Sequence, residues 1–396
     1  MFSRFLKRQY IPLYGLLLVQ LLMGMMLGPR SNFFQIYLNE AVAYPVWQVS
    51  QVLALGQVVT MLSSILAGSL GDRWGHKWVL ALGMLALVLS NLLFNVEIPG
   101  AVIVLWCVGS FGMALTTIGG QGYLTMASSV GVLGLASALY NWGYTAGGAI
   151  GTPLATVVLG ENNYVLLGLT LAGFTLLPVI VASLLPQLQP SEARKRKRGN
   201  NVGYSIFLRK RIFILALLRF LPTCYYGITS LFPILIKQQT GDNNAVAWFA
   251  TVYLISASLA QLVAGRASDR YGVRMPTRIS FGAILVAIAG TILTVPSIWG
   301  MYIFGTLGIS AAWALSTLLP GLVMTAAEPE IHGRVFGGLH MTWTIAMMLG
   351  TLLGGALLDI DIRLPFVIVG VLNVIAFMLT VPFFRSAKRE AAVAEV

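Results

Sequence analysis

Long apolar runs separated by short polar connections constrain this chain more than any other feature of its sequence. Hydrophobic residues make up 57% of the 396 residues and charged residues only 10%, and the mean hydropathy is +0.83. A membrane-spanning helix needs about 20 predominantly apolar residues, and runs of about that length recur along the whole sequence. We therefore expect an all-α polytopic membrane protein, because no soluble domain of this length would tolerate so apolar a composition.

Cutting the sequence at charged residues and at Pro, Gly or Asn predicts twelve spans in two sets of six. The first set covers residues 11–38, 46–68, 78–95, 100–125, 132–158 and 164–186, and the second covers 211–237, 244–266, 275–295, 298–323, 333–358 and 364–384. Between the sets lies a connection with the basic run Arg194–Arg198, which no other connection matches. The predicted domains are an N-terminal half (1–188), a cytoplasmic linker (189–210) and a C-terminal half (211–396).

The distribution of basic residues predicts the orientation. Of the 25 Lys and Arg, Lys237 and Arg363 fall on the face opposite the termini and Arg30 and Arg219 fall within spans, while all the others lie on the side of the termini. The positive-inside rule then places both termini in the cytoplasm, and we expect a multi-pass protein of the inner membrane. The net charge of +12 follows from this bias, so nucleic acid is not an expected partner.

A charged, glycine-containing stretch occurs after the second and again after the eighth predicted span. The first copy is Gly68-Ser69-Leu70-Gly71-Asp72-Arg73-Trp74-Gly75-His76-Lys77, and the second is Gly265-Arg266-Ala267-Ser268-Asp269-Arg270-Tyr271-Gly272-Val273-Arg274. The copies are separated by about half the chain, which indicates an internal repeat. Glycines allow a tight turn, and the flanking cations hold it in the cytoplasm. The expected gating residues are Gly68, Gly71, Asp72, Arg73, Gly75, Lys77, Gly265, Asp269, Arg270, Gly272, Arg274 and, before the eleventh span, Arg334.

This G-x-x-x-D-R-x-G-x-[RK] pattern resembles the signature of the major facilitator superfamily, and the resemblance covers almost the whole chain. It implies two pseudo-symmetric six-helix halves that alternate access to a midplane site, with helices one, four, seven and ten lining the cavity. Arg334 is then a candidate partner of Asp269, whereas Asp72 has no charged partner in the connection 126–134 and is expected to rely on a helix dipole. Leu105 or Val108 stands where the superfamily carries an arginine linked with proton coupling, which argues against classical drug/proton antiport.

Glycine-rich stretches in helices five and eleven predict close helix crossings. Helix five carries Gly147-Gly148-Ala149-Ile150-Gly151-Thr152-Pro153 and helix eleven carries Gly350-Thr351-Leu352-Leu353-Gly354-Gly355. Small residues spaced four apart let helix backbones approach closely. The stretch in helix five also resembles the antiporter-associated motif of the superfamily, which keeps a functional role open for Gly147, Gly151 and Pro153.

Two arginines within spans are the sharpest candidates for substrate contacts. An arginine at mid-helix costs about 2.5–3.5 kcal/mol on insertion scales, and no acidic residue lies mid-span to offset it. We expect Arg30 to be the principal contact for a carboxylate, phosphate or sulfonate, and Arg219, nearer the cytoplasmic end, to snorkel in part. The helical frames separate the two by about 15 Å in depth. The candidate substrate-binding residues are Arg30, Phe34, Tyr37, Ser110, Thr117, Gln121, Asn141, Arg219, Thr223, Tyr226, Ser310, Trp313, Thr317 and His340.

The sequence thus predicts a secondary transporter of a small organic solute, with an organic anion favoured. Efflux of lipophilic or drug-like compounds is the alternative, favoured by 15 methionines and many aromatics, and a non-transporting membrane sensor is a remote one. No enzyme, cofactor, metal site or disulfide framework is expected, and no ATP-binding phosphate loop is present. The expected partners are the small-molecule substrate, a coupling proton or other ion, and the lipid bilayer, and the chain is expected to act as a monomer.

Overall fold

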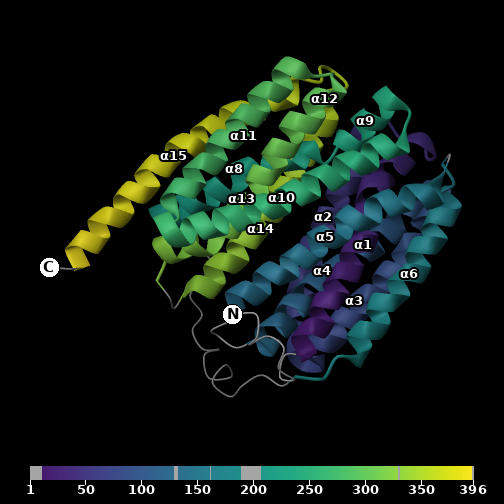
Figure 1. Cartoon of the computed structure of the whole chain (residues 1–396), viewed down its shortest axis with the longest axis horizontal. Coiled ribbons are helices and arrows are strands. Elements are labelled where there is room, and N and C mark those ends of the chain that lie inside the picture. Colours follow the sequence, from purple (N-terminus) through teal and green to yellow (C-terminus); the bar gives the residue numbers. More distant parts are fainter. Residues whose placement is uncertain (1–10, 129–132, 161, 189–206, 329–330, 395–396) are drawn as a thin grey trace. The chain divides into compact units, whose positions relative to one another are not determined.

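The computed structural model describes residues 11–128, 133–160, 162–188, 207–328 and 331–394; for Asp72, residues 133–135, 332–334 and 386–394 it describes the backbone alone. Within this part of the chain, eleven helices are long and apolar enough to cross a membrane. A further long helix, α5 of 27 residues, lies at the position of the fifth predicted span. The protein is therefore an all-α, multi-pass membrane protein (Figure 1).

The helices follow the predicted order of spans. The first set comprises α1 (Ile11–Glu40), α2 (Val46–Trp74), α3 (His76–Asn91) with a 3₁₀ continuation (Leu92–Asn95), α4 (Pro99–Ala127), α5 (Leu133–Leu159) and α6 (Tyr164–Leu184). The second comprises α8 (Lys210–Thr229), α9 (Phe232–Thr240), α10 (Asn243–Tyr271), α11 (Arg274–Thr294), α12 (Ile298–Gly300) with a π-helical continuation (Met301–Gly305), α13 (Thr306–Ala326), α14 (His332–Leu358) and α15 (Leu364–Ala394).

The helices assemble into two compact units. Unit 1 comprises Met1–Tyr44, Leu55–Gly199 and Asp242–Thr251, and unit 2 comprises Pro45–Ala54, Asn200–Gly241 and Val252–Val396. Unit 1 thus includes the first turns of α10, and unit 2 includes the first turns of α2. Within unit 1, the Thr251 hydroxyl of α10 donates a 3.1 Å hydrogen bond to the carbonyl oxygen of Ala149 in α5.

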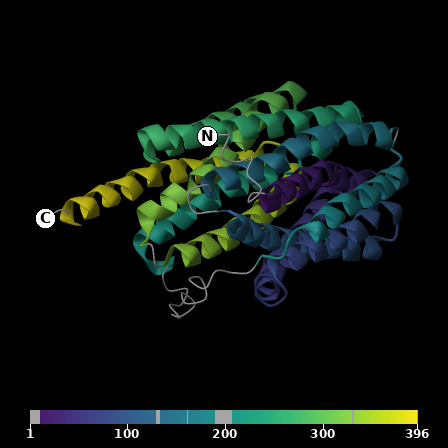
Figure 2. The same cartoon turned by 60° about the horizontal axis from the view of Figure 1, so that its bottom comes forward.

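The same packing scheme recurs in both units. In unit 1, α1 packs against α5 and α6, and α3 packs against α4 and α6. In unit 2, α8 packs against α14 and α15, and α11 packs against α13 and α15. Figure 2 shows α1 running beside α5 and α6 from a second direction. This correspondence is the structural form of the repeat that the two charged stretches indicate.

The glycines of α5 bring α1 and α5 into close contact. A Cβ atom at Gly147 would collide with the carbonyl oxygen of Leu21, and one at Gly151 would collide with that of Met25. The obstacle is backbone in both cases, so a larger residue has no flexible neighbour to displace. The prediction of a close crossing from the spacing of small residues is confirmed.

The crossing of α8 and α14 in unit 2 is built in the same way. A Cβ atom at Gly350 of α14 would collide with the carbonyl oxygen of Cys224, and one at Gly227 of α8 would contact the carbonyl oxygen of Met347. Each helix therefore contributes a glycine to the contact, and the helices approach at backbone distance.

The repeated charged stretch differs from the expected tight turn. The helix α2 continues through Gly68 and Gly71 to Trp74, and only Gly75, with φ of 89°, leaves helical geometry. The second copy ends in the same manner at Gly272, with φ of 75°. A single glycine with positive φ is sufficient to end a helix, so the other glycines of the stretch lie in helix.

The predicted seventh span is interrupted. Instead of one helix over 211–237, α8 ends at Thr229 and α9 begins at Phe232. Pro233 lies in the first turn of α9, where its missing N–H is tolerated, but it cannot donate to the preceding turn as a continuous helix requires.

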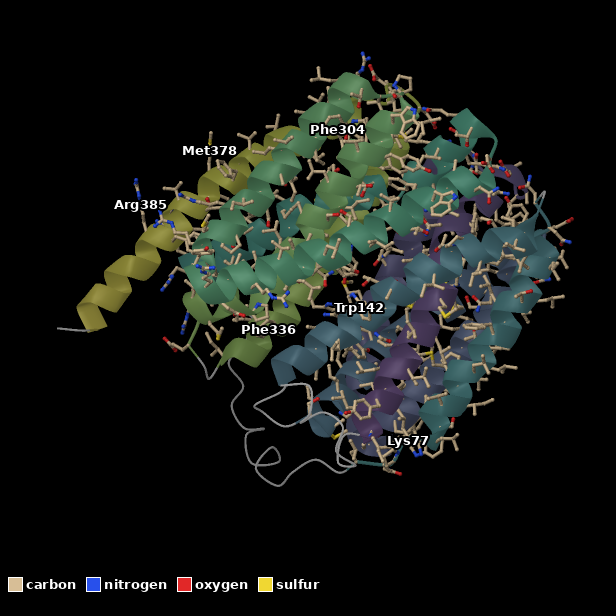
Figure 3. The ribbon with its side chains drawn as sticks, viewed as in Figure 1. Lys77, Trp142, Phe304, Phe336, Met378 and Arg385 are labelled. Carbon is tan, nitrogen blue, oxygen red and sulfur yellow. The ribbon has the colours of Figure 1, made fainter. Side chains whose placement is uncertain are left out.

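Apolar side chains cover the outer faces of the helices. Met378 of α15 is 64% exposed and points away from its helix (Figure 3). In water such exposed apolar side chains would be costly, whereas lipid tails solvate them. Arg385, about two turns further along α15, projects from the same helix (Figure 3).

Candidate functional site

The Arg30 side chain is buried within unit 1 between α1, α3 and α4. Its Nη2 atom donates a 2.6 Å hydrogen bond to the hydroxyl of Ser90, and its Cζ atom lies 4.8 Å from the ring centroid of Trp106. A desolvated cation over a tryptophan face contributes about 2 kcal/mol. Within the described residues the guanidinium makes no ion pair with a carboxylate, so its direct partners are neutral.

Glycines make room for this arrangement. A Cβ atom at Gly109 of α4 would collide with the Nη2 atom of Arg30 and the Oγ atom of Ser90. A Cβ atom at Gly56 of α2 would meet the Nε1 atom of Trp106 in the same way. We name Arg30, Ser90, Trp106 and Ser110, with the glycines at 56 and 109, the Arg30 cluster.

Phe34 and Tyr37, which share the face of α1 with Arg30, are fully packed. Phe34 stacks on Trp106 with ring centroids 4.2 Å apart, and the Tyr37 hydroxyl donates a 2.6 Å hydrogen bond to the carbonyl oxygen of Val96. Tyr37 also contacts Phe94 edge to face. These contacts place both aromatics in the core of unit 1, and contact with a substrate stays a prediction.

The remaining candidates of the first half are spread over two helices. Ser110 is buried in the Arg30 cluster, and its carbonyl oxygen accepts a 3.2 Å hydrogen bond from Thr60 of α2. Thr117 of α4 is half-buried, whereas Gln121 of α4 and Asn141 of α5 are exposed. Of the four candidates, only Ser110 belongs to the Arg30 cluster. Thr117, Gln121 and Asn141 lie outside it.

The Arg219 side chain of α8 is half-buried in unit 2. Its Nη1 atom donates a 2.6 Å hydrogen bond to the hydroxyl of Ser316 in α13, and its buried Nε–H group has no partner among the described residues. The imidazole of His340 in α14 is near enough to the guanidinium to interact with it electrostatically. His340 in turn stacks on Trp343, with ring centroids 5.8 Å apart. We name Arg219, Ser316, His340 and Trp343 the Arg219 cluster.

An aromatic pair lies on the same two helices. Tyr226 of α8 and Trp313 of α13 meet edge to face with ring centroids 6.2 Å apart. Both positions follow the helical spacing of the cluster, because Tyr226 lies two turns from Arg219 and Trp313 one turn from Ser316. The pair thus lies on the same two helices as Arg219 and Ser316, one to two turns away along each helix.

The other candidates of the second half have differing environments. The Thr223 hydroxyl is buried and donates a 2.7 Å hydrogen bond to the carbonyl oxygen of Arg219. Ser310 is buried and its hydroxyl meets no hydrogen-bond partner within the described ranges, and Thr317 is exposed.

Sequence reasoning missed Ser90, Trp106, Ser316 and Trp343. Ser316 and Trp343 lie three residues from the candidates Trp313 and His340, a spacing that places two side chains on one helix face. This spacing could have identified Ser316 and Trp343 from the sequence. Ser90 could not be found in this way, because it lies on helix three, which is not one of the helices expected to line the cavity.

The gating candidates are described in part. The side chains of Asp72 and Arg334 lie outside the described residues, so the proposed pairing of Arg334 with Asp269 stays a prediction. Asp269 is exposed in the last turn of α10. Lys77, at the start of α3, lies 4.7 Å from the ring centroid of Trp78 (Figure 3), and Arg270 lies 5.3 Å from that of Tyr271.

A histidine of the first charged stretch has a structural role that the sequence did not indicate. Cβ atoms at Gly71 of α2 and Gly122 of α4 would both collide with the His76 ring. The ring therefore sits between two helices at positions where glycine alone leaves space. Within the described residues, no group of three or more His, Cys, Asp or Glu is placed to hold a metal ion.

Comparison with known proteins identifies the family. The sequence profile of the Major Facilitator Superfamily matches residues 16–243 and 221–395. The chain belongs to this superfamily. It is accordingly a membrane transporter and not an enzyme, and its partners are a small-molecule substrate and the lipid bilayer in which its helices lie, as a multi-pass protein of the inner membrane.

Related superfamily members include drug-resistance proteins. The chain is 26% identical to the multidrug resistance protein MdtH of Aeromonas salmonicida over 88% of each chain, and 22% identical to multidrug resistance protein 1 of Bacillus subtilis over 87% of this chain and 89% of that one. It is 28% identical to the class H tetracycline resistance protein of Pasteurella multocida, of which it spans about half the length (47% of this chain, 48% of the relative).

The solved structures of the superfamily confirm the fold. A crystal structure of the nucleoside transporter NupG in a mutant form matches with a TM-score of 0.76, covering 94% of this chain and all of that one at 17% identity. At this identity the likeness concerns the fold alone. The prediction of a major facilitator fold from the repeated charged stretch is confirmed.

Proposed function

We propose that this transporter exports amphipathic organic compounds that carry an acidic group, and that the Arg219 cluster receives the acid. The observation that carries the proposal is the half-buried side chain of Arg219. In the part of the chain that the structure describes, its guanidinium has one hydroxyl partner, Ser316, and its Nε–H group has none. The proposal keeps the organic anion that the sequence favours, and it moves the main contact from Arg30 to Arg219.

The charge of Arg219 favours an anionic group. Ser316 is a neutral acceptor, and protonation of His340 would add a second positive charge beside the guanidinium. A carboxylate that reached Arg219 would accept two hydrogen bonds in the fork geometry of the guanidinium and would supply the missing negative charge. Because Arg219 is half-buried and Arg30 is buried, Arg219 is the more accessible of the two cations.

The aromatic side chains favour an apolar or aromatic body attached to that acid. His340, which interacts electrostatically with the guanidinium, forms a ring pair with Trp343, and Tyr226 and Trp313 form a second pair on the helices that carry Arg219 and Ser316. Ring faces and edges attract other rings by about 0.5–1.5 kcal/mol beyond the burial of area. Such aromatic side chains accept many apolar shapes, which suits a range of substrates.

The direction of transport rests on the relatives. The resistance proteins MdtH of Aeromonas salmonicida and multidrug resistance protein 1 of Bacillus subtilis match most of this chain. Resistance by a membrane transporter requires removal of the compound from the cell, which supports export here.

Efflux of uncharged lipophilic compounds is the second candidate. The aromatic pairs Tyr226–Trp313 and His340–Trp343 favour it without any role for the charge of Arg219. The two candidates differ in one respect that an experiment can measure, namely whether removing the acid from a compound removes its transport.

The test uses matched pairs of compounds, an aromatic carboxylic acid and its methyl amide, in proteoliposomes with and without a pH gradient. The proposal expects preferential transport of the acid. Arg219→Gln should lower that preference about tenfold or more, since a hydrogen bond to a charged group contributes about 1.5–3 kcal/mol. Arg219→Lys should retain part of it. Arg385→Gln, an exposed cation of α15 away from the cluster, is the matched control.

Equal transport of acid and amide, unchanged in Arg219→Gln, would favour the second candidate instead. A dependence of flux on the pH gradient would identify the proton as the coupling ion, and its absence would turn attention to other ions.

A further inference from the structure

Four arginines lie where α10 ends and α11 begins in unit 2, at intervals of four residues. They are Arg266 and Arg270 of α10 and Arg274 and Arg278 of α11. The first three are exposed, and Arg278, one turn inside α11, is half-buried. Side chains four residues apart share one face of a helix, so each helix presents a pair of guanidinium groups beside the turn. We name these four residues the arginine corner.

The positive charge of the arginine corner has little compensation. Within the described residues, Arg266, Arg274 and Arg278 form no hydrogen bond and no ion pair, and Arg270 lies against an aromatic ring. The Nε–H group of Arg278 is buried and has no acceptor there. Asp269, the acidic residue of this stretch, is exposed and likewise forms no ion pair in that part of the chain. The corner therefore carries an excess of positive charge that an anionic partner would neutralise.

The turn that carries the arginine corner is held in place by packing. Val273, between the two helices, packs against a buried cluster made of Ala264 from α10 and of Ala314 and Leu318 from α13. A Cβ atom at Gly321 of α13 would lie only 3.2 Å from the Val273 side chain, so the turn and α13 are in close contact. The four arginines thus project from a fixed scaffold, and a partner that binds them does not have to order the backbone.

An exposed apolar stripe begins beside Arg274 and Arg278 and runs along α11. Its members recur at whole turns of the helix and are each more than half exposed: Met275, Ile279, Val286 and Leu293. Lipid tails solvate side chains of this kind. Because Met275 and Ile279 directly follow the two arginines in sequence, the cationic surface and the lipid-facing surface adjoin at this end of α11.

We propose that the arginine corner binds the headgroup of an anionic phospholipid whose acyl chains lie along the α11 stripe. The fork of a guanidinium matches two oxygens of a phosphate, and the negative charge offsets the excess of positive charge. Arg278 lies about 6 Å deeper along the helix than Arg274, and its long side chain can extend toward the headgroup level. Basic residues at a membrane surface attract anionic lipids in this way.

The two surfaces together define the chemical class of the lipid. A zwitterionic headgroup brings an ammonium group with its phosphate, which the arginines repel, so a lipid with a net negative charge is favoured. The apolar stripe favours a lipid over a free phosphate, because only the lipid also contacts Met275 and Ile279. The surface includes no residue of the Arg219 cluster and does not depend on the function proposed for it.

The experiment measures lipid binding to the full-length protein in detergent by native mass spectrometry. Dioleoyl phosphatidylglycerol is titrated in one arm and dioleoyl phosphatidylcholine, with the same acyl chains, in the other. A third arm adds inorganic phosphate to the phosphatidylglycerol titration at constant ionic strength. We expect the first phosphatidylglycerol to bind with higher apparent affinity than phosphatidylcholine, and inorganic phosphate to compete poorly because it lacks acyl chains.

Arg278→Gln should weaken the apparent affinity for the first phosphatidylglycerol about tenfold, since it removes hydrogen bonds to a charged group. Arg278→Lys should retain part of the affinity, because it keeps the charge but loses the fork. Arg274→Gln alters an exposed position and should also weaken binding, which keeps the test decisive if Arg278→Gln folds poorly. Arg385→Gln is the matched control, because it removes one exposed cation from α15, the helix that packs beside α11 (Figures 1 and 3).

A preference for phosphatidylglycerol that Arg274→Gln or Arg278→Gln lowers and Arg385→Gln leaves unchanged supports the site. The proposal is overturned if the two lipids bind equally, or if Arg385→Gln lowers the preference as much as Arg278→Gln, since the attraction is then a diffuse effect of the basic surface. It is also overturned if inorganic phosphate displaces the lipid at equal concentration, because the apolar stripe then contributes nothing. None of these outcomes depends on transport, so they are separate from the test of Arg219.

Discussion

The Nη2 atom of Arg30 donates a 2.6 Å hydrogen bond to the hydroxyl of Ser90, and this bond joins α1 to α3 across 60 positions of the sequence. A cation that sequence reasoning assigns to a substrate is here held by a neighbouring helix of the same unit. This hydrogen bond bears on the stability of the fold. Any change that separates Arg30 from Ser90 leaves a buried positive charge with one hydrogen-bond acceptor fewer.

We expect Gly109→Ala to destabilise the protein by about 1–3 kcal/mol, the usual cost of overpacking. The added methyl group would collide with the Arg30 guanidinium and the Ser90 hydroxyl at once. Gly100→Ala, on the same helix with no atom within 4 Å of the added Cβ, is the control and should be neutral or slightly stabilising. Thermal unfolding in detergent measures both, and equal melting temperatures would show that the cluster can relax around the methyl group.

The crossing of α1 and α5 should tolerate substitution just as poorly. Gly151→Ala places a methyl group against the backbone of Met25, which cannot rotate away. We expect lower yield of folded protein and a lower melting temperature, whereas Gly173→Ala in α6, where the added Cβ meets nothing within 4 Å, should be tolerated. Size-exclusion profiles and unfolding curves of the two variants decide the matter, and a monodisperse, fully stable Gly151→Ala protein would contradict the close crossing.

The predicted topology can be tested by labelling single cysteines in a background without Cys107 and Cys224. A cysteine at Asn200, in the predicted cytoplasmic linker, should react with an impermeant maleimide only after the membrane is opened. A cysteine at the exposed Glu97 should react in intact cells. The reason is the concentration of basic residues on the side of the linker. The reverse pattern of labelling would invert the topology.

Asp269→Asn and Asp72→Asn should impair transport more than expression. A charge at a helix terminus contributes about 0.3–1 kcal/mol when exposed and up to about 2 kcal/mol when partly buried, which shifts a balanced equilibrium between two conformations severalfold. Flux per expressed protein and cysteine accessibility on the cytoplasmic side are the measurements. Asp359→Asn, at the far end of α14, is the control. Normal flux in both variants would remove these aspartates from the gating mechanism.

Much of the fold was predictable because it depends on local patterns. Apolar runs predicted the spans, and the repeated charged stretch predicted the superfamily. The break between α8 and α9 was harder to see, since Pro233 lies inside an apolar run that reads as one span. The extension of α2 to Trp74 was missed because several glycines suggested a turn, whereas only Gly75 adopts positive φ.

The candidate site was predictable only in its residue types. Helical periodicity grouped Arg30, Phe34 and Tyr37 on one face of α1, and the structure keeps that face together. Periodicity does not say what the face meets, and here it meets Ser90, Phe94 and Trp106 of unit 1.

The sequence by itself determined that this protein is a helical membrane transporter with an internal repeat, because hydropathy, charge asymmetry and motif spacing act within one helix or between neighbours in the chain. Only the tertiary structure decided which cation is buried and which is accessible. That outcome depends on side chains from distant helices, such as Ser90 for Arg30 and Ser316 for Arg219, and on glycines that let them approach. Desolvation and hydrogen bonding depend on distance in space, which no spacing along a single helix encodes.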